Sequence, residues 1–373
     1  MISFIKAYIA QNEKKYIEDV ITLDKQSGDG KYTALCNKIL KSYSPKSYPL
    51  LTTSCTHSME MSALLLNIKS GDEVIIPSYS FSSSANAFLL RGAKLIFCDS
   101  QENNPNININ NFESLITKKT KAVLMVHYAG VACPMDEILD IGNKYGIKVI
   151  EDAAQGMNAY YKGNPLGTIG DLGCVSFHDT KNVSCGEGGA IFINDLSLKQ
   201  SAEIIREKGT DRSAYFRGEI DKYEWKGLGS SYLLSDILAA KLLAQLEEVS
   251  FITKQRKKIW EYYYDSLATL EEQGKCKMPD IPEFADHNGH IFYLVCRNGK
   301  ERDRLISYMK TNDIQSTFHY LSLHKSKFFK DKYQGYDLPN ADRFSDCLIR
   351  LPIYPQLRLS KQNKVIDKII SYY

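Results

Sequence analysis

The chain has 373 residues, and its 43% hydrophobic and 24% charged residues are typical of a folded globular protein. Its 47 Lys and Arg residues against 44 Asp and Glu residues leave a net charge of +3, which excludes a strong global field for binding nucleic acid or an anionic membrane. No apolar run approaches the roughly 20 residues of a membrane span. The length suggests about two domains.

The start of the chain and the cysteines predict a cytoplasmic location. The segment that begins at Met1 turns polar too early for a signal peptide. The nine cysteines include no Cys-x-x-Cys pair, and several lie in apolar surroundings. Free thiols in a reducing compartment are therefore favoured over a disulfide framework or a zinc site.

Apolar runs rich in Val, Ile and Phe predict buried strands in the first half of the chain. These runs span residues 73–77, 94–99, 122–127, 148–152, 173–178 and 190–194. Helical spacing of apolar residues predicts helices at 56–68 and 135–145. Strands that alternate with helices indicate an α/β fold with a mostly parallel sheet covered on both faces.

The rest of the chain has a different pattern. Long helices are predicted at 198–208 and 235–255, followed by a strand at 290–296 and a helix at 300–312. Two domains are expected, a large one at 1–247 and a smaller α+β domain at 248–373. The asparagine cluster at 103–111 predicts a surface turn, and the tyrosines around Tyr262 predict core or dimer packing.

One stretch carries the residues for a chemical site. Asp152 ends a buried strand, where ligands of parallel sheets gather, although a carboxylate there also serves as a helix cap. Lys181 follows the next strand, with Ser176 upstream and a glycine-rich turn at 186–189 downstream. A lysine amine for an aldehyde and a carboxylate for a pyridinium nitrogen are what pyridoxal 5′-phosphate requires.

A phosphate site is predicted at residues 51–58, where hydroxyl-bearing residues lead into the first long helix. Backbone N–H groups at a helix N-terminus bind anions. Taken alone, this segment is better explained as an ordinary Ser or Thr cap.

In order and spacing, these segments resemble the DegT/StrS family of pyridoxal phosphate-dependent sugar-nucleotide aminotransferases over nearly the whole chain. The landmarks are Gly28-Asp29-Gly30, Ser54-Cys55-Thr56, Pro77 to Phe81, Val126 to Gly130, Glu151-Asp152-Ala153-Ala154-Gln155, Ser176 to Gly189, Gly229 to Asp236, His319-Tyr320 and Leu351 to Pro355. The resemblance implies the aspartate aminotransferase-like fold of type I, with a large mostly parallel α/β/α domain and a smaller C-terminal α+β domain.

Within the family, one branch is similar in further segments. The runs at 204–212, 216–218 and 221–225 resemble the transaminases that form dTDP-4-amino-4,6-dideoxygalactose. Ser54-Cys55-Thr56 and the segment 229–233 also resemble that branch.

The resemblance assigns roles around the cofactor ring. Lys181 would bind the cofactor as a Schiff base and later move the proton. Asp152 would keep the pyridine nitrogen protonated, Gln155 would contact the side of the ring that carries the 3-hydroxyl, and Phe81 would stack on the ring face.

The resemblance also assigns the phosphate and substrate contacts. Cys55, Thr56 and Ser176 would hold the phosphate. Ser231 stands where many members have an Asn that reaches the phosphate of the neighbouring subunit's cofactor, and its shorter side chain leaves a direct contact open. Such a cross-subunit site implies a homodimer.

Five histidines lie near these segments. The resemblance implies a substrate-binding role for His319 and Tyr320, in a C-terminal segment that reaches the mouth of the site, and His178 lies near enough to Lys181 in sequence to line the pocket as well. His127, on an apolar strand, is expected to be a core residue with its hydrogen bonds satisfied. His287 and His290 flank a turn and lack metal partners.

The implied reaction is amino transfer from L-glutamate to C4 of a nucleotide-linked 4-keto-6-deoxy sugar, expected to be dTDP-4-keto-6-deoxy-D-glucose. The product would be a dTDP-4-amino-4,6-dideoxyhexose, in the galacto or gluco configuration, for surface glycans such as the lipopolysaccharide O-antigen. A 3-aminotransferase for a 3-keto sugar nucleotide stays open as the alternative. Lys181 argues against a family dehydratase, and together with Asp152 against a non-catalytic sugar-nucleotide-binding regulator.

Overall fold

The computed structural model describes residues 1–373, and its centre is a seven-stranded sheet in the order β1-β9-β8-β5-β4-β2-β3. The strands are β1 Tyr48–Thr52, β2 Glu73–Pro77, β3 Lys94–Cys98, β4 Thr120–Val126, β5 Lys148–Asp152, β8 Leu172–Ser176 and β9 Gly189–Ile193. Only β9 runs against the others, since it pairs antiparallel with both β1 and β8. The six strands predicted from the sequence are confirmed to within about two residues at each end.

Strand β1 is the one strand of the seven-stranded sheet that the sequence analysis missed. It lies at the edge of the sheet and pairs only with β9, with Pro49 opposite Phe192. Proline has no N–H to donate and is confined to edge strands. Pro49 therefore makes the segment look unlike a strand in the sequence, yet proline is compatible with an edge strand such as β1.

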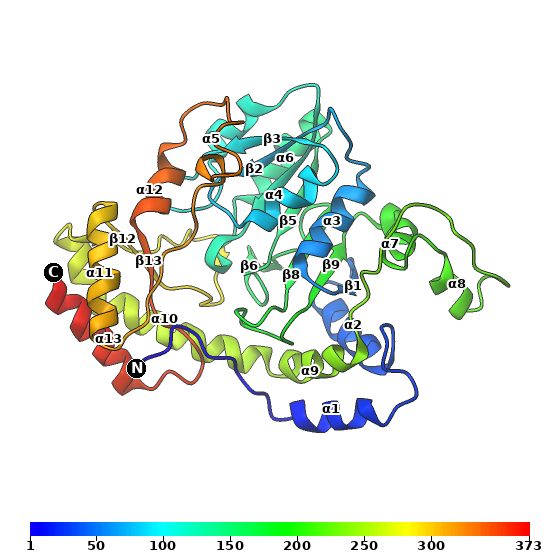
Figure 1. Cartoon of the computed structure of the whole chain (residues 1–373), viewed down its shortest axis with the longest axis horizontal. Helices are drawn as coiled ribbons and strands as arrows, with labels where there is room; N and C mark the ends of the chain where they lie inside the picture. Colours follow the sequence, from blue (N-terminus) through cyan, green and yellow to red (C-terminus); the bar gives the residue numbers. More distant parts are fainter.

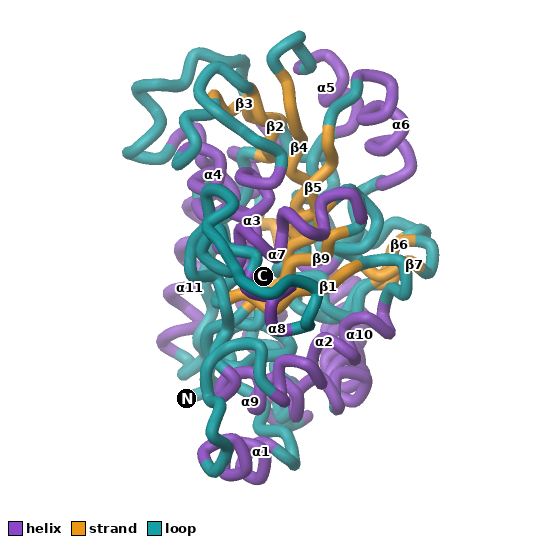
Figure 2. Tube along the Cα trace, turned by 90° about the vertical axis from the view of Figure 1, so that its right-hand side faces the viewer, coloured by secondary structure: helices purple, strands orange, loops and turns teal.

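Helices lie on both sides of the central sheet (Figure 2), and alternating residues of the strands pack against the two helical layers. On β2, Val74 and Ile76 pack with Met59 and Phe88 of one layer, whereas Ile75 faces the other. The first helices are α1 Glu13–Ile21, α2 Lys31–Tyr43, α3 Cys55–Leu65, α4 Ser82–Leu89, α5 Ile109–Phe112, α6 Met135–Tyr145, α7 Lys199–Arg206, α8 Arg212–Phe216 and α9 Asp236–Glu247. Helices α3 and α4 cover one face, and α2, α6 and α9 cover the other.

The part of the chain from α10 onwards packs beside the central sheet (Figure 1) and has a hydrophobic core of its own. Its elements are α10 Val249–Glu272, β10 Cys276–Lys277, β12 Tyr293–Cys296, α11 Gly299–Thr311, α12 Pro339–Cys347, β13 Leu348–Arg350 and α13 Leu359–Tyr372. The strands form a sheet in the order β10-β12-β13. Ile2 belongs to this core and bridges to Ile314, so the first residues pack with the C-terminal part although the sequence analysis placed them in the large domain.

Short elements complete the fold. A three-stranded sheet in the order β11-β6-β7 joins the two parts through β6 Tyr160–Tyr161, β7 Asn164–Pro165 and β11 Ala285–Asp286. The 3₁₀ turns are η1 Glu113–Leu115, η2 Tyr128–Gly130, η3 Leu196–Leu198 and η4 Leu323–Lys325. All nine cysteines are buried free thiols, and none of the helices combines the length and apolar character that crossing a membrane requires.

Two sequence predictions need correction. The helix predicted at 235–255 is two helices, which break at Glu248, where the side chain accepts hydrogen bonds from Tyr8 and from the Gln11 N–H. The asparagine cluster is not a surface turn throughout, because Asn104 and Asn106 are buried. The Asn106 amide donates to the Val131 carbonyl and accepts from the Tyr128 N–H, which ties the cluster to the end of β4.

Candidate active site

A cavity of about 530 Å³ lies at the carboxyl ends of the parallel strands β4, β5 and β8. Val126, Asp152 and Ser176, the last residues of these strands, all line it. The opposite wall comes from the C-terminal part and includes Tyr320 and Arg350. Ligands of parallel α/β sheets bind at this edge.

Asp152 is held in one orientation by the large domain. The Ser84 hydroxyl donates to its Oδ2 at 2.7 Å, and the Ala154 N–H donates to its Oδ1 at 3.1 Å. Only 5% of the residue is exposed. A buried carboxylate with fixed acceptor directions can hold a proton on a ring nitrogen opposite it.

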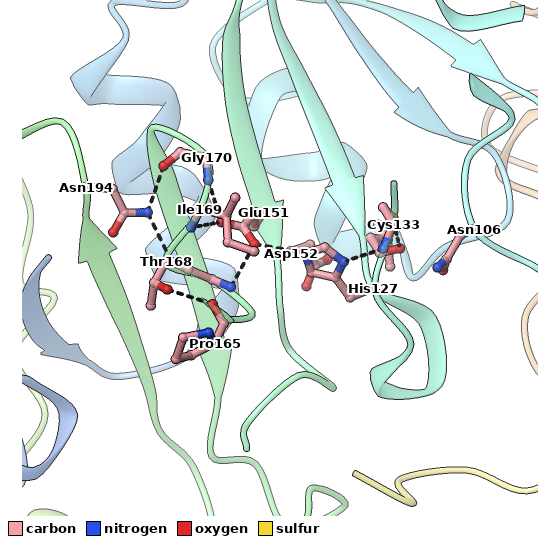
Figure 3. Close-up of polar contacts among 12 residues, drawn as sticks. Asn106, His127, Cys133, Glu151, Asp152, Pro165, Thr168, Ile169, Gly170 and Asn194 are labelled. Atoms are coloured by element: carbon pink, nitrogen blue, oxygen red, sulfur yellow. Dashed lines mark hydrogen bonds and ion pairs between the residues drawn. The ribbon is translucent and has the colours of Figure 1, made fainter. Parts of the chain in front are cut away.

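The neighbouring Glu151 points away from the cavity and anchors the strand end (Figure 3). Its carboxylate accepts the N–H groups of Gly167, Ile169 and Gly170 at 2.7 to 2.8 Å. It also accepts from His127 Nε2 at 3.0 Å. This network joins β4, β5 and the loop before β8 into one rigid unit behind Asp152.

His127 closes that network and is fully buried. Its Nδ1 accepts the Cys133 N–H at 3.1 Å, so its proton is on Nε2 and is donated to Glu151. The prediction of a core histidine with satisfied hydrogen bonds is confirmed.

Lys181 faces the cavity from the loop after β8. Its Nζ makes no hydrogen bond or ion pair with any protein atom. Burial lowers the pKa of the Lys181 amine, and the charge of Arg350 lowers it further, against the opposing effects of Cys55 and Asp152. An amine with a lowered pKa is a nucleophile near neutral pH.

The loop that carries Lys181 is fixed by the C-terminal part of the chain. The Asn182 amide donates to the Asn288 carbonyl at 3.1 Å, and its oxygen lies 2.8 Å from His290 Nδ1. Asn288 in turn donates to the carbonyls of Gln155 and Met157. The turn at 287–290 therefore connects the Lys181 loop to the C-terminal part through these hydrogen bonds.

An anion site lies at the N-terminus of α3. Ser54 caps the helix by accepting the His57 N–H, while the N–H groups of Cys55 and Thr56 have no acceptor in the protein. Gly189 allows the start of β9 to lie directly against the backbone of Ser54, because a Cβ at this position would come within 2.4 Å of the Ser54 carbonyl carbon. Free N–H groups at a helix N-terminus bind a phosphate.

The other residues predicted for the phosphate lie close by or on the surface. Ser176 lines the same cavity, and its Oγ accepts the His178 N–H at 3.3 Å. Ser231 is exposed and does not line the cavity of its own chain. Its predicted contact to a neighbouring subunit stays a prediction.

Aromatic and amide groups cover the centre of the cavity. Gln155 accepts the Ala129 N–H at 2.6 Å and donates to the Tyr320 hydroxyl at 3.1 Å. The Phe81 ring, 57% exposed, lies 5.9 Å from the Tyr320 ring between centroids. Both rings line the cavity, so a flat ligand can stack there.

The histidines differ in their access to the cavity. His319 lines it and contacts the Tyr128 hydroxyl at 3.1 Å, and burial lowers its pKa well below the usual value. His178 also lines it, half-exposed, with Glu187 at 3.5 Å. His57 is not among the lining residues.

Sequence reasoning missed several lining residues, among them Phe4, Ser84, His290 and Arg350. Ser84 and His290 act through partners that are distant in sequence, and no local pattern indicates them. Arg350 had a signal, since it is a charged residue inside the apolar run 348–351. Phe4 lines the cavity from the N-terminal segment, which is held against the C-terminal part by the parallel β-bridge between Ile2 and Ile314.

These residues fit pyridoxal 5′-phosphate. Asp152 can pair with the ring nitrogen, Lys181 offers an amine whose pKa burial lowers, and the free N–H groups of α3 suit the phosphate. The chemistry of this set, in one cavity with an aromatic lining, is what the cofactor requires.

The comparison with known proteins decides the class. The profile of the DegT/DnrJ/EryC1/StrS aminotransferase family matches residues 7–370. The chain belongs to this family. It is therefore an aminotransferase that depends on pyridoxal phosphate, as the sequence predicted.

Individual relatives agree with this assignment. The chain is 34% identical over 349 residues to the uncharacterized protein MJ1066 of Methanocaldococcus jannaschii, covering 91% of this chain and 89% of that protein. NtdA from Bacillus subtilis, solved with bound cofactor PMP, matches with a TM-score of 0.87 and 28% identity over 98% of this chain and 82% of its own. The putative sugar aminotransferase Spr1654 from Streptococcus pneumoniae, in its PMP form, has a TM-score of 0.91 and 23% identity over 100% and 99% of the two chains. The fold predicted for the aminotransferase is confirmed.

Proposed function

We propose that this aminotransferase transfers the amino group of L-glutamate to C4 of a nucleotide-linked 4-keto-6-deoxy sugar, with dTDP-4-keto-6-deoxy-D-glucose as the substrate. The observation that carries amino transfer is the unpaired amine of Lys181, which shares a cavity with Asp152 and the free N–H groups of α3. The sugar acceptor is supported by the branch-like runs at 204–212, 216–218 and 221–225 and by the structural likeness to Spr1654, a putative sugar aminotransferase. The product would enter the synthesis of a surface glycan.

The residues of the cavity divide the work between them. Bound pyridoxal phosphate supplies an electron sink for the carbon that loses its proton. Asp152 holds the proton on the ring nitrogen, and the freed Lys181 Nζ takes the proton from Cα of the amino donor. In the second half-reaction, Lys181 delivers a proton to the sugar carbon, so the kinetics should be ping-pong.

A homodimer is part of the proposal. The segment between α7 and α9 protrudes from the large domain (Figure 1) and exposes large apolar side chains. Phe216 is 65% exposed, Trp225 81% and Leu228 62%. Exposed apolar groups of this size mark interaction surfaces. A second copy of the chain that covers the segment between α7 and α9 would also bring Ser231 towards the cofactor bound by that copy.

The test is a product assay with purified enzyme, pyridoxal phosphate, L-glutamate and dTDP-4-keto-6-deoxyglucose, read by mass spectrometry and NMR. The expected product is a 4-amino-4,6-dideoxy sugar, and the coupling constants at C4 distinguish galacto from gluco. Lys181→Ala is the matched control and should form no product. A wild-type enzyme that forms 2-oxoglutarate from glutamate but leaves this sugar unchanged would contradict the proposed acceptor and favour a 3-keto substrate.

A further inference from the structure

A buried histidine outside the cavity connects the two parts of the chain that form the cavity walls. His324, in the turn η4, is 5% exposed and lies between Ser78, directly after β2, and Asp342 of α12. The rings of Phe97 and Tyr333 lie beside it, with 6.4 and 4.9 Å between ring centroids. None of these residues lines the cavity, so the catalytic site described above does not explain the arrangement.

The two ring nitrogens of His324 have different partners. Ser78 Oγ lies 2.7 Å from Nδ1 and accepts the His324 backbone N–H at 3.4 Å. The Ser78 hydroxyl has no other acceptor, so it donates to Nδ1, and the ring proton is on Nε2. Nε2 faces Asp342 Oδ1 at 3.5 Å, and this oxygen is buried without a hydrogen-bond partner. The ring therefore accepts from the large domain and presents its N–H to the C-terminal part.

Serine, histidine and aspartate in this order also form the catalytic group of many hydrolases. Here Ser78 is 0% exposed and does not line the cavity, so no acyl group can reach its hydroxyl. Asp342 is also paired with Lys325. Burial lowers the pKa of His324, so the ring is neutral near pH 7. The group is therefore a contact between two parts of the fold and no second active site.

On the C-terminal side, the histidine holds one end of the segment that carries Tyr320. At the start of this segment, Thr317 exchanges two backbone hydrogen bonds of 2.8 and 3.4 Å with the last residue of β13. At its end, the Leu323 N–H donates to the Ser78 carbonyl at 2.9 Å, next to the contacts of His324. Tyr320 thus lies between two fixed points, and the second of them belongs to the large domain.

On the large-domain side, the same contact lies close to Phe81. Ser78 comes three residues earlier in the chain, and its N–H donates to the Cys98 carbonyl at the end of β3. The rings of Phe81 and Tyr320 both line the cavity, with 5.9 Å between their centroids. One histidine therefore ties together the two segments that present these rings.

We propose that His324 is a positioning residue, which sets the gap between Phe81 and Tyr320 by joining Ser78 to the segment that carries Tyr320. This inference rests on the proposed stacking of the cofactor ring on Phe81, and it does not depend on the identity of the sugar. With the link intact, a ring in this gap has one orientation. Without it, the ring still binds but is aligned less well with the groups that react.

Substitutions of His324 separate the two contacts of its ring. His324→Asn keeps an acceptor at the position of Nδ1 and loses the contact with α12. His324→Gln places its amide near the position of Nε2 and loses the acceptor for the Ser78 hydroxyl. Ser78→Ala removes that same hydrogen bond from the other partner.

Two matched controls leave the link intact. Ser80→Ala removes a buried serine hydroxyl that donates only to the Pro77 carbonyl of its own turn. Asp346→Asn removes an exposed carboxylate of α12, the helix that carries Asp342.

Three readouts are taken on the full chain. Single-turnover absorption of the holoenzyme with L-glutamate gives the rate constant and the apparent Kd separately. Circular dichroism in the absorption band of the bound cofactor reports the orientation of its ring. Hydrogen exchange, measured by mass spectrometry with and without the cofactor, reports the N–H groups of Leu323 and His324, which both bond to Ser78.

The expected result in Ser78→Ala and His324→Gln is a fall of about tenfold in the rate constant, with Kd for glutamate changed by less than about threefold. The dichroism of the cofactor should decrease, and exchange in a peptide that covers residues 319–326 should become about tenfold faster. His324→Asn should lose less, because at 3.5 Å the contact with Asp342 is the weaker one. Ser80→Ala and Asp346→Asn should match the wild type.

The double variant tests whether the two residues act through one hydrogen bond. Ser78→Ala combined with His324→Gln should cost no more than either substitution alone, because both remove the same contact. Losses that multiply would overturn the inference, since they would mean that the two residues act separately.

Other outcomes also decide the matter. A wild-type rate and wild-type cofactor dichroism in Ser78→Ala and His324→Gln would overturn the inference even if hydrogen exchange became faster, because the link would then only stabilise the fold. An equal loss in Ser80→Ala would overturn it as well. A failed sugar assay leaves the glutamate half-reaction and these results intact, whereas a wild-type enzyme without any cofactor signal would overturn the proposed site and this inference together.

Discussion

The polar groups on the two sides of the cavity differ in whether they are hydrogen-bonded to other protein atoms. On the large-domain wall, the carboxylate of Asp152 is held by neighbouring donors, and so is that of Glu151, which lies behind this wall. On the wall from the C-terminal part, Arg350 offers donors that no protein atom accepts. A satisfied network fixes a position, whereas free donors in a cavity await a ligand. We infer that the first wall holds the cofactor rigidly and the second recognises the substrate.

The largest expected effect comes from the residue between these walls. Lys181→Ala should lower turnover by at least about 1000-fold, because it removes the group that moves the proton. Steady-state kinetics with added pyridoxal phosphate measure the loss. A conservative Lys181→Arg variant, which keeps a charge but is no proton acceptor, should be equally inactive. Activity within tenfold of wild type in either variant would remove Lys181 from the mechanism.

The next effect concerns the carboxylate that faces the ring. Asp152→Asn keeps the size and can still accept from Ser84, but it loses the charge that holds a proton on the ring nitrogen. The single-turnover rate with glutamate should fall by about 100-fold while the cofactor stays bound. Ser84→Ala, which removes one of the donors to Asp152, should cost less than Asp152→Asn. The opposite order would contradict the assignment.

Stability should separate the two walls. Glu151→Gln places an amide N–H₂ against donors that need acceptors, so the free energy of unfolding should fall by about 3 kcal/mol. Arg350→Met removes a charge without partners and should leave the free energy of unfolding unchanged or raise it by about 1 kcal/mol. Urea unfolding monitored by circular dichroism measures both. Equal decreases in the free energy of unfolding of Glu151→Gln and Arg350→Met would show that the two side chains contribute equally to stability, which contradicts the comparison.

The smallest effect is a shift in pH dependence. The uncharged Lys181 amine captures added pyridoxal phosphate, so in cofactor-free enzyme the capture rate should rise with pH and level off above the pKa of Lys181, which lies below the usual 10.5. Removing the Arg350 charge favours the protonated amine. The curve for Arg350→Met should therefore move to higher pH, by about half a unit. Arg304→Met, which removes an exposed arginine, is the control and should leave the curve unchanged. A shift of the Arg350→Met curve to lower pH would contradict the electrostatic effect of Arg350 on Lys181.

The sequence predicted the large-domain wall better than the other. Asp152 ends a strand and Lys181 lies in the loop after the next one, and strand ends are visible in a local pattern of apolar residues. Arg350 interrupts an apolar run, a signal that the sequence analysis did not use, and only the folded chain shows that its Nε is buried without an acceptor. The same reason explains Phe4, which reaches the cavity from the other end of the chain.

The misjudged elements have similar causes. Glu248 breaks the predicted helix because Tyr8 and Gln11 bind its side chain, and both lie far away in sequence. Asn104 and Asn106 look like turn residues, yet their amides satisfy buried backbone groups, including the Asp280 carbonyl. Local propensity predicts turns and helices, while contacts between distant segments decide burial and breaks.

The most direct test of the account is borohydride reduction of the holoenzyme, followed by peptide mass spectrometry. The account predicts one modified peptide, with the mass of the reduced cofactor on Lys181. Label on another lysine, or a wild-type enzyme that binds the cofactor without any reducible link, would contradict the central claim that this cavity is the site of amino transfer.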